Sequence, residues 1–205
     1  MVVTMETSTD TRERIISAAQ ELIYAKSYNE VGVQEICDRA RVKKGSFYHF
    51  FTSKRDLALA VLDQSQVFMY ETIISKAFAS DIAPLARIER FFTTVYNFHQ
   101  QVKQNTGSVL GCPFGNLGCE MSTQDEEIRS RVVDILHAAE RPFENALAEA
   151  VTNGDLPAID TAATATAIFA YVEGIMLYAK TSNDPEIIRE LGKHALKLTV
   201  PASMQ

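Results

Sequence analysis

Residues 41–57 of the chain read RVKKGSFYHFFTSKRDL, a short segment with an unusual composition for this chain. It combines lysines and arginines with four aromatic residues around Gly45, and it has no acid before Asp56, although the 205-residue chain has a formal net charge of −6. The window 39–55 contains no Asp or Glu, whereas residues 61–205 hold 11 basic and 18 acidic residues. A basic face on an acidic, soluble body suggests binding to a polyanion. Because a short window can also lack acids by chance, the surrounding sequence is needed to distinguish a binding face from a chance composition.

The sequence around this stretch has the apolar spacing of helices. Apolar residues recur at helical intervals through residues 11–26, and Thr9 or Asp10 is the expected N-cap of that helix. Two short helices are then expected over residues 33–40 and 45–51. A short helix, a tight turn and a second short helix rich in basic and aromatic residues form a helix-turn-helix, whose second helix enters the major groove of DNA.

A longer fourth helix is expected to begin near Ser53 and to run through residue 78. Ser53 followed by Asp56 three residues later resembles a capping box, with Asp in place of the usual Glu. Three short helices bury little apolar surface on their own, so this fourth helix must support them.

The rest of the chain also has a helical pattern, and no segment has the pattern of a strand. One helix is expected to start at Pro84, and another at Ser122 or Thr123. The second of these should end at Gly154 and be kinked at Pro142. About nine helices result, so the predicted fold class is all-α, with a three-helix N-terminal domain and a larger helical C-terminal domain.

The chain has no clear membrane or secretion signal. The most apolar long stretch, residues 161–180, is interrupted by Glu173 and rich in Ala and Thr, which indicates a buried helix and not a membrane span. The first ten residues lack the pattern of a signal peptide. Cys37, Cys112 and Cys119 are too few and too scattered for a disulfide framework. We therefore expect a cytoplasmic protein that contacts no membrane.

Residues 11–62 resemble the N-terminal DNA-binding domain of the TetR family of transcriptional repressors, and GSFYHFFTSK at 45–54 is the most specific part of the match. The resemblance implies an all-α homodimer. Ligand binding in the larger C-terminal domain would move the fourth helix and spread the two DNA-binding heads. It also implies three regions: a disordered tail at 1–8, the helix-turn-helix domain at 9–55, and an effector-binding and dimerisation domain at 56–205.

The resemblance further implies which side chains contact double-stranded operator DNA. Gly45 would let the backbone approach the DNA closely, and Tyr48 and Lys54 would bind phosphates. Gln34 would contact a base edge, where Gln suits adenine. The predicted DNA-binding residues are Gln34, Lys43, Lys44, Gly45, Ser46, Tyr48, His49 and Lys54. The residues expected in the core of this domain are Cys37, Val42, Phe47 and Phe50.

Three positions depart from the family's pattern. The family often has Ser or Thr where Gly32 stands and Ser where Lys43 stands, so two helices lack a side-chain cap, which costs a few tenths of a kcal/mol for Gly in place of Ser. It often has Gly where Arg41 stands, and a positive φ there would cost Arg about 1 kcal/mol. The added positive charge either attracts phosphate or changes the preferred operator.

The C-terminal domain supplies the candidate effector-binding residues. Aromatic residues at helical spacing also fit an ordinary core, so both interpretations stay open. Glu173, inside an apolar helix, either faces a cationic ligand or pairs with a basic residue across the dimer. The predicted effector-binding residues are Phe68, Phe92, Tyr96, His99, Cys112, Phe114, Met121, Tyr171, Glu173 and Tyr178.

Cys112 supports an alternative way of sensing. It precedes Pro113, which favours the first position of a helix, so its thiol would lie at a helix N-terminus that stabilises a thiolate. The segment is similar to one in a TetR subgroup that includes the electrophile-responsive repressor of N-ethylmaleimide reductase. The resemblance makes Cys112 a candidate electrophile or redox sensor, whereas the simpler interpretation is a small buried apolar residue.

Two further classes of function are weaker. A cysteine-dependent enzyme could use Cys112 with His99 as its base, but nothing in the sequence brings them together or supplies an orienting acid. His137, Glu140 and Glu144 share one helix face, a spacing that is common on solvated helices and does not define a metal site. We expect no enzymatic activity, no metal and no cofactor.

The sequence therefore predicts a dimeric TetR-like regulator, most simply a repressor bound to a palindromic operator. A small apolar or aromatic effector, or modification of Cys112, would release it. Dimerisation is expected through the last two helices, where small residues permit close packing: Ala163, Ala167, Ala170 and Gly174.

Overall fold

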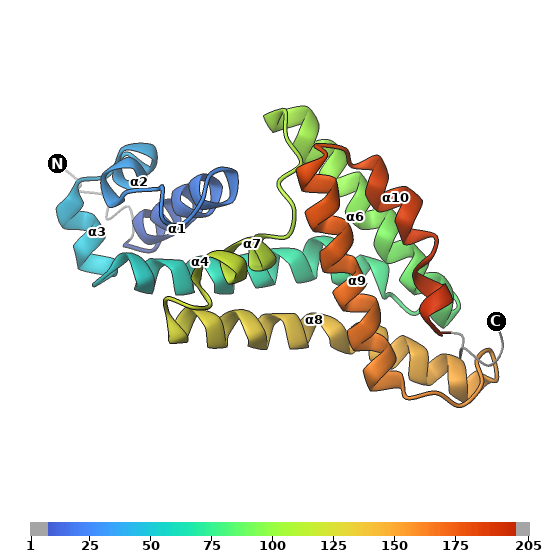
Figure 1. Ribbon diagram of the computed structural model, residues 1–205. Coiled ribbons are helices and arrows are strands. Elements are labelled where there is room, and N and C mark those ends of the chain that lie inside the picture. The colour runs from blue at the N-terminus through green and yellow to red at the C-terminus, as the bar shows by residue number, and fades with distance from the viewer. Residues whose placement is uncertain (1–7, 200–205) are drawn as a thin grey trace. The chain divides into compact units, whose positions relative to one another are not determined.

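The computed structural model describes residues 8–199, and these residues form helices only (Figure 1). A π-helical segment joins α4 to α5 without a break, so the described residues hold nine helices and no strand, which confirms the predicted all-α class. The elements are α1 Ser8–Ala25, α2 Val33–Ala40, α3 Lys44–Phe50, α4 Lys54–Met69, a π-helix Tyr70–Ile74, α5 Ser75–Ala77, α6 Pro84–Thr106, α7 Pro113–Met121, α8 Glu126–Asn153, α9 Thr161–Thr181, α10 Glu186–Gly192 and a 3-10 helix Ala195–Thr199.

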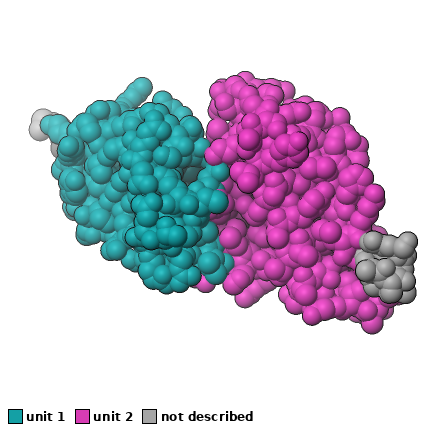
Figure 2. Space-filling model, in the orientation of Figure 1, with its two compact units in different colours: residues 1–67, 116–133 teal, residues 68–115, 134–205 magenta. Residues whose placement is uncertain are grey.

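The chain divides into two compact units (Figure 2). Unit 1 comprises residues 1–67 and 116–133, and unit 2 comprises residues 68–115 and 134–205. Unit 1 thus joins the helix-turn-helix region to the end of α7 and the start of α8. The functional boundary predicted at residue 55 stays a prediction, and all of the predicted tail except Ser8 lies outside the described residues.

The core of unit 1 is built from the apolar stripes of its first four helices. Ile15 and Ala19 on α1, one helical turn apart, are completely buried. Cys37 and Phe47 are also completely buried, as expected, whereas Val42 and Phe50, the other two residues expected in this core, are only partly buried against it. Phe47 anchors α3 and leaves the neighbouring residues of that helix on the surface.

The turn between α2 and α3 has the strained geometry that its sequence predicts. Arg41 ends α2 in the left-handed conformation, with φ 56°. The guanidinium of Arg14 on α1 donates to the carbonyl oxygens of Ala40 and Arg41, the latter at 3.2 Å. Neither Gly32 before α2 nor Lys43 before α3 makes a side-chain cap. A contact from α1 thus holds the C-terminal end of α2, while the N-termini of α2 and α3 lack side-chain caps.

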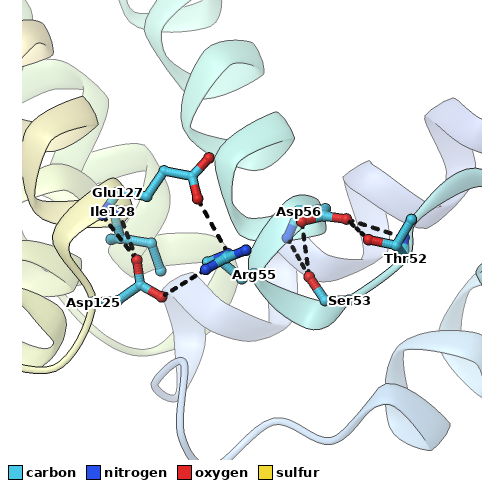
Figure 3. A network of polar contacts seen from close by, with 7 residues as sticks. All are labelled: Thr52, Ser53, Arg55, Asp56, Asp125, Glu127 and Ile128. Carbon is cyan, nitrogen blue, oxygen red and sulfur yellow. Dashed lines mark hydrogen bonds and ion pairs between the residues drawn. The ribbon is translucent and has the colours of Figure 1, made fainter.

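The start of α4 is capped as predicted (Figure 3). The Ser53 hydroxyl accepts a hydrogen bond from the Asp56 N–H at 3.0 Å. The Asp56 carboxylate accepts from the Thr52 N–H at 3.2 Å and also binds the Thr52 hydroxyl, and these bonds hold the pKa of Asp56 below its usual value. The reciprocal pair fixes the direction in which the chain enters α4.

The predicted caps of two other helices are wrong. Helix α1 begins at Ser8, so Thr9 and Asp10 lie inside it. Helix α8 is capped by Asp125, whose Oδ1 accepts from the Ile128 N–H at 3.0 Å (Figure 3), and not by Ser122 or Thr123. The Ser122 hydroxyl donates instead to the carbonyl oxygen of residue 118, because α7 ends in a turn of its own before α8 starts.

Unit 2 has a core of interlocking phenylalanines. Phe143 on α8 meets Phe78 and Phe91 edge-on, each with ring centroids 4.8 Å apart. Pro142 lies inside α8, which continues to Asn153. Gly154 follows with φ 81°, which agrees with the predicted helix end. Helices α6, α9 and α10 complete this unit (Figure 1).

Candidate DNA-binding interface and effector region

Helix α3 presents an outward face above a single buried anchor. Phe47 is completely buried, whereas Tyr48 beside it is 56% exposed, and the two rings meet edge-on at 5.1 Å. Lys44 and His49 are also exposed on this short helix. A rigid helix with exposed cationic, hydroxyl and imidazole groups suits contact with phosphates and base edges.

Gly45 at the start of α3 has no packing reason to be a glycine. A Cβ atom there would meet nothing within 4 Å inside the protein. Lys43 just before α3 is exposed, and Ser46 just after Gly45 is half-buried. The open surface around Gly45 would let an external molecule approach the backbone closely.

Two other predicted DNA-binding residues already have partners within unit 1. The exposed Gln34 side chain donates to the Asp38 carboxylate at 2.7 Å, and its amide oxygen is left for another donor. The Lys54 ammonium binds the carbonyl oxygen of Tyr28 and lies 4.2 Å from the centroid of the Tyr28 ring. Burial lowers the pKa of Lys54. A phosphate contact by Lys54 would have to compete with Tyr28, and that contact stays a prediction.

Sequence reasoning missed two residues that organise this unit. Arg55 on α4 lies between the carboxylates of Asp125 and Glu127 at the start of α8, at 4.0 and 3.3 Å (Figure 3). Glu120 on α7 accepts hydrogen bonds from the backbone N–H groups of Tyr28 and Asn29. No local pattern could have found these contacts, since their partners are about 70 to 90 positions away in the sequence.

The predicted effector-binding residues fall into three groups. Phe92, Tyr96, His99, Phe114 and Met121 are buried; Cys112, Tyr171 and Glu173 are half-buried; Phe68 and Tyr178 are exposed. Met121 belongs to unit 1 and the other nine residues belong to unit 2. The periodic pattern missed the exposure of Phe68 and Tyr178, and whether any of the ten residues lines a ligand site stays a prediction.

Two of the tyrosines already bind other groups in unit 2. The Tyr96 hydroxyl donates to the Glu186 carboxylate at 2.6 Å and accepts from the Gln100 amide at 2.9 Å. The hydrogen bond to Glu186 raises the pKa of Tyr96. The Tyr171 hydroxyl donates to the carbonyl oxygen of Leu191 at 3.0 Å. These bonds join α6 and α9 to α10 and indicate structural roles for both hydroxyls.

The structure does bring Cys112 and Glu173 together. The Cys112 sulfur accepts from the Gly115 N–H at 3.4 Å, so it caps α7 as its position before Pro113 predicts. Burial, together with the charge and hydrogen bond of Glu173, raises the pKa of the thiol well above its usual value. Burial also raises the pKa of Glu173. A protonated thiol beside a carboxyl group is a weak nucleophile, which disfavours a thiolate sensor in this conformation.

His99 is a neutral, buried side chain. It is 2% exposed, and burial lowers its pKa to about 4. Within residues 8–199, its Nδ1 atom has no hydrogen-bond partner. The polar partner of Cys112 is Glu173 and not His99, so the geometry does not assemble the thiol and imidazole pair of a cysteine enzyme. Over the same described range, no three or more His, Cys, Asp and Glu side chains cluster closely enough to hold a metal ion.

Helix α9 carries a stripe of small and apolar residues on its exposed side. Leu177 and Tyr178 are 65% and 58% exposed. By length and composition α9 could cross a membrane, with 39% of its apolar window buried, but the core helix of a soluble protein passes the same test. The small residues exposed along the stripe are Ala162, Ala163, Ala167, Ala170 and Gly174. Small residues of this kind allow a second helix to approach closely.

A helix-turn-helix head with an exposed basic and aromatic second helix, carried by an all-helical body, defines a DNA-binding transcriptional regulator. Comparisons with known proteins agree. Residues 15–61 match the model of the bacterial regulatory proteins of the tetR family, and residues 84–195 match that of the tetracyclin repressor-like C-terminal domain. The chain belongs to the TetR family of transcriptional regulators, whose members bind operator DNA and act as dimers. The matching families and relatives are regulators and not enzymes.

Its relatives are similar over most of their length. The transcriptional regulator AcuR of Cereibacter sphaeroides is 34% identical over 193 residues, which cover 91% of this chain and 86% of AcuR. The crystal structure of a regulatory protein TetR from Rhodobacter sphaeroides has a TM-score of 0.80 and 32% identity, and the match covers 92% of this chain and 98% of that one. The transcriptional repressor NemR of Escherichia coli is 27% identical over 124 residues, 60% of each chain.

Proposed function

We propose that this TetR-family regulator is a repressor that binds a near-palindromic operator as a homodimer and leaves it when a small apolar or aromatic effector binds. The observation that supports DNA recognition by α3 is its outward face, where Lys44, Tyr48 and His49 project from a helix anchored by Phe47. Two such heads related by a twofold axis match two half-sites about one turn of DNA or more apart.

The exposed stripe of α9 supports dimerisation through α9 and α10. Burying Leu177 and Tyr178 removes apolar surface from water, and Gly174 has open space around its Cα in one protomer. A four-helix arrangement of α9 and α10 with their mates would cover this stripe. A cytoplasmic location agrees with DNA as the partner and with three free cysteines.

The effector is proposed to bind among the aromatic residues of unit 2, near Glu173. Phe92, Phe114 and His99 are buried in unit 2, and within residues 8–199 the His99 Nδ1 atom has no hydrogen-bond partner. If these residues lined a site, it would suit a small apolar or aromatic molecule that makes a single hydrogen bond. The thiol-sensor alternative is disfavoured, because burial and Glu173 keep the Cys112 thiol protonated.

The test is fluorescence anisotropy with the DNA upstream of the protein's own gene at about physiological salt, with excess random competitor. Lys44→Ala should weaken binding and reduce the salt slope by about 0.9 if Lys44 neutralises one phosphate. Lys76→Ala is the control, because it removes the same charge from an exposed position on α5 in unit 2. Equal losses for both variants would show that α3 is not the contact surface.

A second variant separates base contacts from phosphate contacts. Gln34→Ala should relax specificity, with a larger loss on the operator than on random DNA, because a bidentate Gln–adenine pair discriminates by about 1–3 kcal/mol. Asp38→Asn is the matched variant, since it weakens the bond that orients Gln34 without removing the amide. An equal loss of affinity on operator and random DNA for Gln34→Ala would count against base recognition.

A further inference from the structure

The turn that joins α1 to α2 is held by a carboxylate from a distant helix. Glu120 on α7 uses both of its oxygens: Oε2 accepts from the Tyr28 N–H at 2.8 Å and Oε1 from the Asn29 N–H at 2.7 Å. The Asn29 amide also lies 3.8 Å from the sulfur of Met121, the next residue of α7. Charge-assisted bonds to two successive backbone N–H groups fix both the position and the orientation of this turn.

The same turn is held from the other side by α4. The Lys54 ammonium binds the carbonyl oxygen of Tyr28 and lies over the Tyr28 ring, which is 9% exposed. Burial lowers the pKa of Lys54, and the nearby Glu120 carboxylate opposes that shift. The Glu120 carboxylate thus binds the N–H group of Tyr28, and the Lys54 ammonium binds its carbonyl oxygen.

The clamp on this turn bears on DNA recognition because the turn leads directly into α2, whose first turn is otherwise tied to the end of α1 by the ion pair of Lys26 and Glu35 at 2.7 Å. Gly32, the residue before α2, makes no side-chain cap. The turn residue Val31 is completely buried, so a displaced turn would disturb the core on which α3 rests. We therefore expect a displaced turn to shift α2, and through α2 the α3 helix that packs on it.

The other end of α7 is tied to the core of unit 2. A Cβ atom on Gly115 would overlap Oε2 of Glu173 on α9, so the helix start and this carboxyl group lie in close contact. Cys112, which precedes α7, caps it and interacts with the same carboxyl group. Residues 113–115 of α7 belong to unit 2 and the remainder to unit 1, so one nine-residue helix carries both sets of contacts.

We propose that Glu120 is a positioning residue for operator binding. By holding the α1–α2 turn, Glu120 couples α7 to α3, the helix proposed to contact DNA. Glu173 acts on α7 at the opposite end, where it contacts Gly115. The inference rests on the proposed function, since it names the side chain through which a change near Glu173 would reach the DNA-binding head.

The first test compares Glu120→Gln with Glu126→Gln in the full-length chain. Both changes remove one negative charge, but Glu126 pairs only with Arg129 among the ion pairs of the described residues and leaves the turn untouched. The readouts are amide hydrogen exchange of the peptide that spans Tyr28 and Asn29, and affinity for a duplex chosen by in vitro selection with the wild-type protein. Exchange of an α6 peptide checks that unit 2 stays folded.

Glu120→Gln should raise exchange at Tyr28 and Asn29 about tenfold and weaken binding to the selected duplex by about the same factor, since one charge-assisted bond is lost. Glu126→Gln should do neither. Unchanged exchange in Glu120→Gln would overturn the clamp, and raised exchange with unchanged affinity would overturn its role in positioning. If the wild type selects no duplex at all, it is the proposed operator binding that fails, and the coupling with it.

A double-mutant cycle tests the coupling along α7. Gly115→Ala pushes against Glu173 at the start of the helix, and we expect it to weaken DNA binding in the wild type but to have little further effect in Glu120→Gln. Glu173→Gln serves as the second probe if Gly115→Ala does not fold. Additive losses in both cycles would show that Glu120 does not transmit the change.

Discussion

Arg41 and Arg14 together close the turn of the helix-turn-helix: Arg41 holds a φ of 56°, and the Arg14 guanidinium donates to its carbonyl oxygen at 3.2 Å. A left-handed backbone costs a residue with a Cβ atom about 1 kcal/mol or more. Glycine at position 41 would not have this cost, because it has no Cβ atom. The Arg14 contact stabilises the turn from α1 and offsets part of the strain.

Arg41→Gly should therefore stabilise the protein by about 1 kcal/mol, a rise in Tm of about 2–4 °C for a chain of this size. Arg41→Ala is the matched control, because it removes the same charge and side chain but keeps the Cβ atom and hence the strain. Thermal unfolding followed by circular dichroism measures both. A gain in Arg41→Ala equal to that in Arg41→Gly would mean that charge, not backbone strain, limits stability here.

The Arg41 strain shows what the sequence could predict and what it could not. The Ser53–Asp56 cap and the helix starts at Pro84 and Pro113 follow from single residues and their near neighbours, whereas the left-handed turn at Arg41 was suggested only by the family resemblance. Such features depend on backbone geometry that each residue type imposes locally. Local patterns were therefore enough for the head and for the fold class.

Long-range contacts were beyond that kind of reasoning. The bond from Glu120 to Tyr28 joins residues 92 positions apart, and no periodicity marks it. The exposure of Phe68 and Tyr178 was missed for a related reason, since an apolar face predicts burial but not which surface buries it. The same limit explains the cap of α8, where Asp125 took the place expected for Ser122.

His99 should make the stability of the protein depend on pH. Burial lowers its pKa to about 4, so the folded state binds fewer protons than the unfolded state between that value and about 6.5. Stability from this group is thus present above pH 6.5 and is lost as the pH falls toward 4. The loss between pH 7 and pH 4.5 should be about 2 kcal/mol.

His99→Leu should remove that share of the acid destabilisation, as measured by urea unfolding at pH 7 and pH 4.5. His137→Gln is the control, because His137 is exposed on α8. Glu173, whose pKa is raised by burial, contributes with the opposite sign, but it is present in all three proteins and cancels in the comparison. An identical pH dependence in wild type and His99→Leu would show that His99 is protonated equally in both states.

Gly174 should control dimerisation. It lies on the exposed stripe of α9, and a Cβ atom there meets nothing within 4 Å in one protomer. Gly174→Leu should leave the protomer folded but prevent close approach of a second α9, and light scattering at micromolar concentration should then detect monomers. Ala148→Leu, a change at another exposed helix position on α8, should leave the dimer intact. A dimeric Gly174→Leu protein would place the interface elsewhere.

The three cysteines should react with a maleimide in an order set by burial and pKa. Cys119 is exposed on α7, whereas Cys37 is completely buried and burial raises its pKa. The Cys112 pKa is also raised well above its usual value, by burial first and then by Glu173, so little thiolate is present at neutral pH.

We expect the folded wild type to take up one equivalent of maleimide quickly and Cys119→Ser to take up almost none until urea unfolds it. Mass spectrometry of the labelled peptides identifies the site. Because the thiolate is the reactive form, rapid labelling of Cys112 in folded Cys119→Ser would mean that the Glu173 contact opens in solution, and the electrophile-sensor alternative would then regain support.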